Sequence, residues 1–145
     1  MLFLDPASCE AANRNIKADV YFTVADQAMG RKWSSYSLYL NPPSLLSQPT
    51  LCSSFVSKFV SEYKSGNFKE GLLLIRNGAT NASWYGANKL GTLPRIELKT
   101  QRFINGLGSN VNDKRKDSVG RLLIYCGTKY TREEFENHFK SFANI

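Results

Sequence analysis

The sequence predicts one α/β domain spanning residues 1–145, in which a mostly parallel β-sheet carries helices on both faces. Three observations predict this class. The chain has 145 residues, of which 42% are hydrophobic, and this is enough for one buried core. Short apolar runs alternate with amphipathic helical patterns along the chain. Such alternation is typical of βαβ units, whose parallel strands are buried on both faces.

Five apolar runs bounded by turn residues predict the strands. They cover residues 2–5, 19–24, 37–41, 71–76 and 121–126. Ligands of open α/β sheets bind beyond the carboxyl ends of the strands. We therefore expect Asp5 and Asn41, which end two of these runs, to lie at one site.

Three segments have the apolar spacing of amphipathic helices. The clearest runs from Cys52 to Lys64 and ends at Gly66, and a second covers about Ala82 to Leu90. Thr131 opens a third, because acidic residues follow it in the first turn. The aromatic residues of this last helix are expected to pack on the sheet, namely Phe135, Phe139 and Phe142.

Charge and composition narrow the classes of function. Nineteen Lys and Arg against twelve Asp and Glu leave a formal net charge of +7, which favours a polyanionic partner such as nucleic acid. No stretch approaches the roughly 20 consecutive apolar residues of a membrane span. The first residues, Met1-Leu-Phe-Leu, lack the features of a signal peptide. We therefore expect a cytoplasmic protein without a membrane partner.

The few cysteine and histidine residues argue against nucleophilic and metal sites. Cys9, Cys52 and Cys126 are widely spaced, which predicts buried thiols rather than disulfides or a metal site. His138 is the single histidine, and we expect it on the surface rather than in a catalytic triad.

Two polar turns directly follow apolar runs, and we call each of them a polar corner. The first is Asp5-Pro6-Ala7-Ser8. Small residues at such a turn allow the backbone to approach a ligand closely. The alternative is a structural turn in which Ser8 caps the following helix.

The second corner is Asn41-Pro42-Pro43. Pro42 keeps the backbone of Asn41 out of the helical region. Because the two prolines lack backbone N–H groups, hydrogen-bond acceptors outnumber donors at the end of this strand. An Asn side-chain oxygen and a neighbouring carbonyl can accept hydrogen bonds from an exocyclic amine of a base. The nitrogen lone pair is then available to attack an activated methyl group. The alternative for the tripeptide alone is an ordinary proline-terminated strand.

Taken together in order and spacing, these motifs resemble the phage-type DNA adenine-N6 methyltransferase family. The matching segments span residues 2–127 and are Leu4-Asp5-Pro6-Ala7-Ser8, Lys17-Ala18, Tyr21-Phe22-Thr23, Asp26, Lys32-Trp33, Leu40-Asn41-Pro42-Pro43, Phe55-Val56-Ser57-Lys58, Glu62-Tyr63-Lys64-Ser65-Gly66, Asn77-Gly78-Ala79-Thr80, Trp84-Tyr85, Gln101-Arg102-Phe103 and Tyr125-Cys126-Gly127.

The resemblance implies a Rossmann-like methyltransferase sheet, S-adenosylmethionine as cofactor and a base flipped out of double-stranded DNA. By this resemblance, Asp5, Pro6, Ala7 and Ser8 would hold the methionine end of the cofactor, and Asp26 its nucleoside end. Asn41, Pro42 and Pro43 would hold the target amine. The family usually has an upstream segment with a Thr-Pro element, so we expect part of the cofactor pocket to be incomplete here.

Ser44 departs from the family pattern, since many members carry there an aromatic residue that stacks on the flipped base, a contact worth about 1–3 kcal/mol. Trp84 and Tyr85 are candidates for a wall of the base pocket, or else ordinary core aromatics. Residues 105–119 are expected to form a flexible loop, in which Lys114, Arg115 and Lys116 either contact DNA phosphates or are simply solvated.

The function predicted is S-adenosylmethionine-dependent methylation of an exocyclic amine in DNA, adenine N6 ahead of cytosine N4, in a bacterial or phage-infected cell. The alternative is a truncated, inactive relative that binds DNA or another protein. Methylation of RNA or protein is a third hypothesis.

Overall fold

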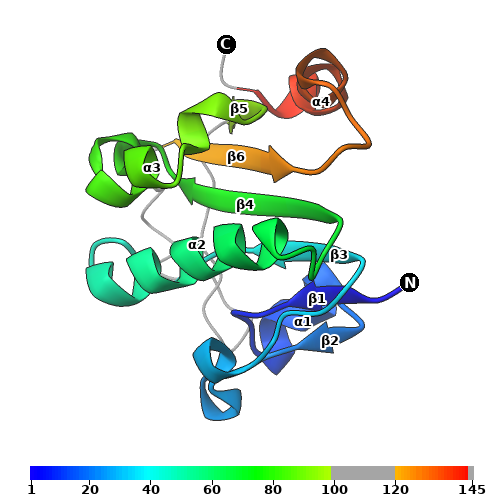
Figure 1. Ribbon diagram of the computed structural model, residues 1–145, viewed down its shortest axis with the longest axis vertical. Coiled ribbons are helices and arrows are strands. Elements are labelled where there is room, and N and C mark those ends of the chain that lie inside the picture. The colour runs from blue at the N-terminus through cyan, green and yellow to red at the C-terminus, as the bar shows by residue number, and fades with distance from the viewer. Residues whose placement is uncertain (99–119, 144–145) are drawn as a thin grey trace.

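The computed structural model describes residues 1–98 and 120–143, and its described part contains a six-stranded sheet between two layers of helices (Figure 1). The strand order is β2-β1-β3-β4-β6-β5. The strands are β1 Phe3–Asp5, β2 Val20–Tyr21, β3 Ser37–Leu40, β4 Glu70–Arg76, β5 Arg95–Leu98 and β6 Arg121–Cys126. The α-helices are α1 Glu10–Ile16, α2 Pro49–Lys64, α3 Ser83–Ala87 and α4 Arg132–Phe139.

The α/β class is confirmed, but the prediction of a mostly parallel sheet is wrong because the sheet is mixed. Strands β2, β1, β3 and β4 pair in parallel, whereas β6 lies antiparallel between β4 and β5. All six residues of β6 are buried. A continuous apolar run of this kind suits a central strand of either direction, so the local pattern did not indicate the reversal.

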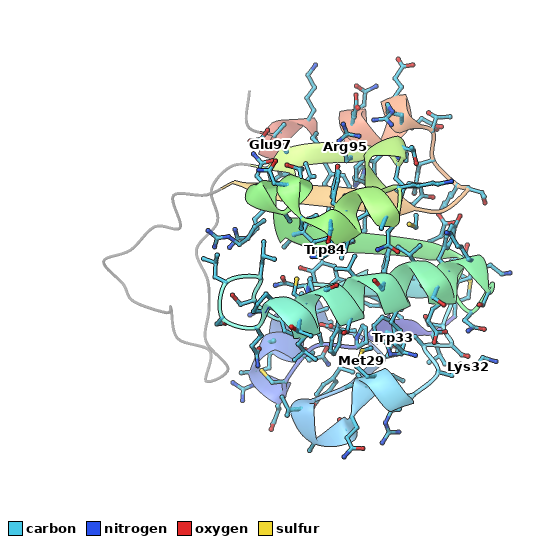
Figure 2. All side chains as sticks on the ribbon, turned by 60° about the vertical axis from the view of Figure 1, so that its left-hand side comes forward. Met29, Lys32, Trp33, Trp84, Arg95 and Glu97 are labelled. Atoms are coloured by element: carbon cyan, nitrogen blue, oxygen red, sulfur yellow. The ribbon has the colours of Figure 1, made fainter. Side chains whose placement is uncertain are left out.

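One face of the sheet is covered by α2. The apolar stripe of this helix includes Phe55, Val56 and Phe59, and it packs on the strands in the larger core cluster. Trp33 is fully buried beside it, where its indole N–H donates to the Ala28 carbonyl at 3.0 Å. Figure 2 shows Trp33 and Trp84 on opposite sides of α2, with Trp84 belonging to α3. The helix begins earlier than predicted, at Pro49, because proline is favoured in a first helical turn.

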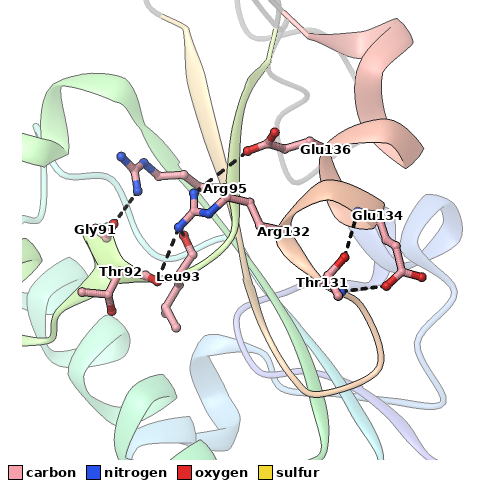
Figure 3. Close-up of polar contacts among 8 residues, drawn as sticks. All are labelled: Gly91, Thr92, Leu93, Arg95, Thr131, Arg132, Glu134 and Glu136. Atoms are coloured by element: carbon pink, nitrogen blue, oxygen red, sulfur yellow. Dashed lines mark hydrogen bonds and ion pairs between the residues drawn. The ribbon is translucent and has the colours of Figure 1, made fainter.

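The other face carries α1 and α4. Phe135 of α4 stacks on Tyr125 of β6 with ring centroids 5.5 Å apart. The predicted start of this helix is confirmed, since Thr131 and Glu134 form a reciprocal capping box (Figure 3). The prediction that Phe142 packs on the sheet is wrong: α4 ends at Phe139, the chain continues in a 3-10 turn, and Phe142 is 58% exposed.

Several predicted elements differ in extent. The strand predicted over 19–24 is confined to Val20–Tyr21, because Thr23 caps a 3-10 turn over Val24–Asp26. The helix predicted over Ala82–Leu90 ends at Ala87, and Lys89 then adopts the left-handed conformation (φ 55°). The expectation of three buried thiols is wrong for Cys9, which is partly exposed, and right for Cys52 and Cys126.

Two elements were not predicted from the sequence. Helix α1 has a short pattern with few large apolar residues, and β5 is only partly buried at the edge of the sheet. Such short elements carry weak periodicity, and their neighbours in the fold decide their conformation.

Candidate active site

The strand order places a crevice between the carboxyl ends of β1 and β3. From β1 the chain passes through α1 to β2 on one side, whereas from β3 it passes through α2 to β4 on the other. Because the two connections leave in opposite directions, the sheet opens at this switch point, where ligands of open α/β sheets bind. Asp5 ends β1 and Asn41 follows β3, so the structure brings these two predicted residues to the same edge.

Asp5 is a buried acid with a shifted proton affinity. It is only 2% exposed, and this burial raises the pKa of its carboxyl to about 6. The Ala7 amide, which donates to Oδ1 at 3.2 Å, and the side chain of Ser8 offset part of the effect. The corner itself is held to the residue that follows β2, since Ser8 N–H donates to the Phe22 carbonyl at 2.9 Å.

The alternative role proposed for Ser8, capping of the following helix, is wrong. The N-cap of α1 is Cys9, whose sulfur accepts from the Ala12 amide at 3.4 Å. Pro6 is fully buried, which fixes the path of the corner between strand and helix.

A cavity of about 470 Å³ opens beside this corner on the face that carries α1 and α4, and we call it the Asp5 cavity. Its residues are Asp5, Ala7, Ala12, Asn15, Ile16, Tyr39, Asn41, Leu74, Leu98, Arg121, Leu123, Phe139 and Phe142. Burial and the neighbouring Asp5 charge raise the pKa of Tyr39 to about 12, so its hydroxyl stays protonated at neutral pH. The cavity therefore combines apolar walls with one carboxyl, one phenol, two side-chain amides and one guanidinium group.

A second cavity, of about 290 Å³, also has Asn41 in its lining, and we call it the Trp84 cavity. Its residues are Asn41, Pro42, Pro43, Ser44, Leu45, Cys52, Leu74, Ile75, Arg76, Ala79, Trp84 and Arg121. Asn41, Leu74 and Arg121 line both cavities. The exposed Asn41 is therefore placed between a cavity that contains Asp5 and one that contains Trp84.

Ser44 has a structural contact in this region. Its hydroxyl accepts hydrogen bonds from the Leu46 and Ser47 amides at 3.2 and 3.3 Å, which stabilises the turn after Pro43. Trp84 is 9% exposed and belongs to the core as well as to the cavity wall. Tyr85 packs partly against the core and is not among the residues of the Trp84 cavity.

Asp26 lies apart from both cavities in the structure. Its carboxylate accepts from the Thr23 amide at 2.7 Å and from the Thr23 hydroxyl at 3.0 Å, and these bonds lower its pKa. It is among the residues of neither cavity. The three basic residues Lys114, Arg115 and Lys116 lie outside the described residues.

Sequence reasoning missed three residues of the site: Tyr39, Arg76 and Arg121. Arg76 ends the strand predicted over 71–76, and Arg121 begins the one predicted over 121–126. Their charge at strand ends was a usable signal, but only the antiparallel pairing of β4 and β6 brings them together.

No family model, curated protein or solved structure matches this chain. Among residues 1–98 and 120–143, no helix is long and apolar enough to cross a membrane. The same described residues contain no group of three or more His, Cys, Asp or Glu side chains that could hold a metal ion.

Proposed function

We propose that this protein is an S-adenosylmethionine-dependent DNA methyltransferase that acts on an exocyclic amine, adenine N6 ahead of cytosine N4. One observation carries the proposal: Asn41 lies between the Asp5 cavity and the Trp84 cavity. A methyl transfer needs the accepting amine next to the methyl group of the donor and in line with it, and two cavities that share Asn41 in their linings could hold the donor and the amine close to each other.

The topology also supports the proposal. The strand order reverses between β1 and β3, and the flanking helices α1 and α2 lie on opposite faces, as in doubly wound, Rossmann-like folds (Figure 1). In such folds a cofactor binds at the reversal.

The residues around the Asp5 cavity are suited to S-adenosylmethionine. The volume lies in the range of small-molecule sites, roughly 300–1,000 Å³. Asp5 would accept hydrogen bonds from the amino group of the methionine end, and Ala7 is small enough to let the chain approach it closely. Pro6 and Ser8 would shape this corner, whereas Asp26 would need a change in its contacts with Thr23 to reach the nucleoside end. When bound, the cofactor supplies the activated methyl group.

Asn41 would then position the base. Its side-chain oxygen and the carbonyl of Pro42 accept the two protons of the amine, so that the nitrogen lone pair is directed away from the ring. Pro42 and Pro43 offer no backbone donor that would compete for these acceptors. Trp84 would form one wall of the base pocket, and Ser44 supports the turn after Pro43.

The test measures cofactor binding by calorimetry and transfer of a labelled methyl group to unmodified double-stranded DNA. The Asn41→Ala variant should lower transfer at least about 100-fold, as expected for the loss of a preorganised polar contact. It should keep the thermal stability of the wild type. Asn137→Ala, which changes an exposed residue of α4, is the matched control and should keep full activity.

Other outcomes separate the alternatives. If the wild-type protein gives neither binding heat nor transfer but binds DNA, it is an inactive relative that serves as a DNA-binding protein. Full activity of Asn41→Ala would contradict the role of this residue. Competition among DNA, RNA and protein substrates identifies the accepting polymer.

A further inference from the structure

A third cavity, of about 560 Å³, lies on the face of the sheet that carries α1 and α4, and we call it the aromatic cavity. It is at the opposite end of the strands from Asn41, because its lining includes Phe3, Ser37 and Glu70, which begin β1, β3 and β4. Neither Asp5 nor Asn41 is among its residues. Its volume lies in the range of small-molecule sites, roughly 300–1,000 Å³, so it is a candidate site apart from the proposed reaction centre.

The sheet forms the floor of the aromatic cavity. Tyr39 of β3, Leu72 of β4 and Tyr125 of β6 are successive partners across the three strands, so their side chains point to the same face. On the opposite face, Leu38 and Leu73 are 2% and 0% exposed in the core formed with α2. Tyr39 and Leu72 are only partly buried. Two central strands therefore keep apolar surface that a ligand can cover.

Aromatic side chains of β6, α4 and the loop between them form one wall. Tyr125 stacks on Phe135, with 15° between the ring planes, and Tyr130 meets Tyr125 edge-on with ring centroids 5.8 Å apart. The Tyr125 hydroxyl donates to the Glu70 carboxylate. The same oxygen accepts from the amides of Lys129 and Tyr130 at 3.0 and 3.3 Å. These contacts order the wall in the absence of a ligand, which lowers the entropy lost on binding.

The exposed rim of the aromatic cavity is basic. Lys129 and His138 are both exposed and both belong to its lining. The Lys129 ammonium lies 5.4 Å from the centroid of the Tyr130 ring, and an ammonium in such a contact still has N–H groups for a second partner. The one acid of the lining, Glu70, accepts hydrogen bonds from within the protein. Together with the net charge of +7, this rim favours an anionic group.

We propose that the aromatic cavity binds a small aromatic acid, that is, a planar ring system that carries a carboxylate. The ring lies over Tyr39 and Leu72 and against Tyr130, in the offset or edge-on contacts that aromatic rings prefer. The carboxylate lies at the rim, where the Lys129 ammonium and the His138 imidazole donate to it. This site does not depend on the proposed function, because neither Asp5 nor Asn41 takes part in it.

The first test uses the wild-type protein with naphthaleneacetate as the probe. Calorimetry should give a Kd of about 1 mM or tighter, as expected for a ligand of this size. In ¹H–¹³C spectra, the methyl signals of Leu72 should show saturable shifts caused by the ring current of the ligand. The methyl signals of Leu73 are the internal control and should not move, because this neighbouring side chain points to the opposite face of the sheet.

Related probes test the two parts of the ligand. Naphthalenemethanol has the same rings without the charge and should bind about 3-fold more weakly, the factor expected for an exposed ion pair. Naphthylmethylamine carries the opposite charge and should bind more weakly still. Octanoate has the carboxylate without the rings, and it should bind more weakly than naphthaleneacetate because it cannot make the ring contacts.

Two substitutions, each with a matched control, locate the site. Tyr130→Ala should weaken binding of naphthaleneacetate by about 5-fold through loss of a ring contact. Tyr21→Ala makes the same change in β2, outside all three cavities, and should leave the affinity unchanged. Lys129→Gln should remove the preference for the acid over the alcohol, whereas Lys64→Gln, at the exposed end of α2, should keep it. Circular dichroism checks that each variant is folded.

The outcomes separate this site from the proposed reaction. The inference is overturned if the Leu72 signals do not shift, if Leu73 shifts equally, or if octanoate or the amine binds more tightly than the acid. An unchanged preference for the acid in Lys129→Gln also overturns it, and this exposed residue can be replaced without disturbing the core. Specific shifts at Leu72 with the expected order of probes support the site even if the protein transfers no methyl group.

Discussion

Replacing Asp5 by Asn should stabilise the protein at neutral pH. The carboxyl is 2% exposed, and burial raises its pKa from 3.8 to about 6. Between these two values the unfolded chain is ionised while the folded protein still holds the proton. The free energy of unfolding therefore falls as the pH rises from about 4 to about 6, and it stays lower above pH 6.

The magnitude follows from the two pKa values. Their difference, at about 1.4 kcal/mol per pH unit, corresponds to about 3 kcal/mol. Asn cannot ionise, and its oxygen can still accept from the Ala7 amide. Asp5→Asn should therefore raise the free energy of unfolding by up to about 3 kcal/mol at pH 7.5 and by nearly nothing at pH 4, and it should lower cofactor affinity.

Urea denaturation followed by tryptophan fluorescence, at pH 4, 5, 6 and 7.5, measures this difference. Glu136→Gln is the control, because it removes one exposed acid and should change stability by less than about 0.5 kcal/mol at each pH. The reasoning is refuted if Asp5→Asn is less stable than the wild type at pH 7.5, or if the difference between them does not depend on pH.

Two further substitutions test the packing and the helix cap. Gly71→Ala should lower the free energy of unfolding by about 1–3 kcal/mol in urea denaturation, because the new Cβ would lie 2.5 Å from a ring carbon of Phe68. Gly78→Ala is the control, since a Cβ at that position has no atom within 4 Å. An equal effect of both substitutions would contradict the packing argument. Thr131→Ala should lower the free energy of unfolding by about 1 kcal/mol, because it removes the hydroxyl that accepts from the Glu134 amide at 3.2 Å (Figure 3). An unchanged midpoint of urea denaturation would show that the cap does not contribute to stability.

The strongly patterned elements were predictable from the sequence. The apolar runs of β3, β4 and β6 agree with the strands within one residue at each end, and the stripe of α2 predicted its buried face. The capping box at Thr131 predicted the start of α4. These elements carry their own signal because apolar periodicity and caps act over a few neighbouring residues.

The candidate site was predicted in part. Asp5 and Asn41 were expected at one edge, since both follow apolar runs, and the structure brings them to one cavity. Asp26 has a suitable position in the sequence, but its local contacts with Thr23 keep it outside both cavities. Arg76 was not predicted to line the site, because its place beside Arg121 depends on which strand pairs with β4.

The sequence by itself determined the α/β class, the central strands, the main helix and the two polar corners, because each of these depends on residues adjacent in the chain. Only the tertiary structure decided the reversed direction of β6, the two cavities around Asn41 and the meeting of Arg76 with Arg121. The physical reason is that strand pairing and cavity shape depend on packing between segments that are far apart in the sequence, and no local pattern encodes such contacts.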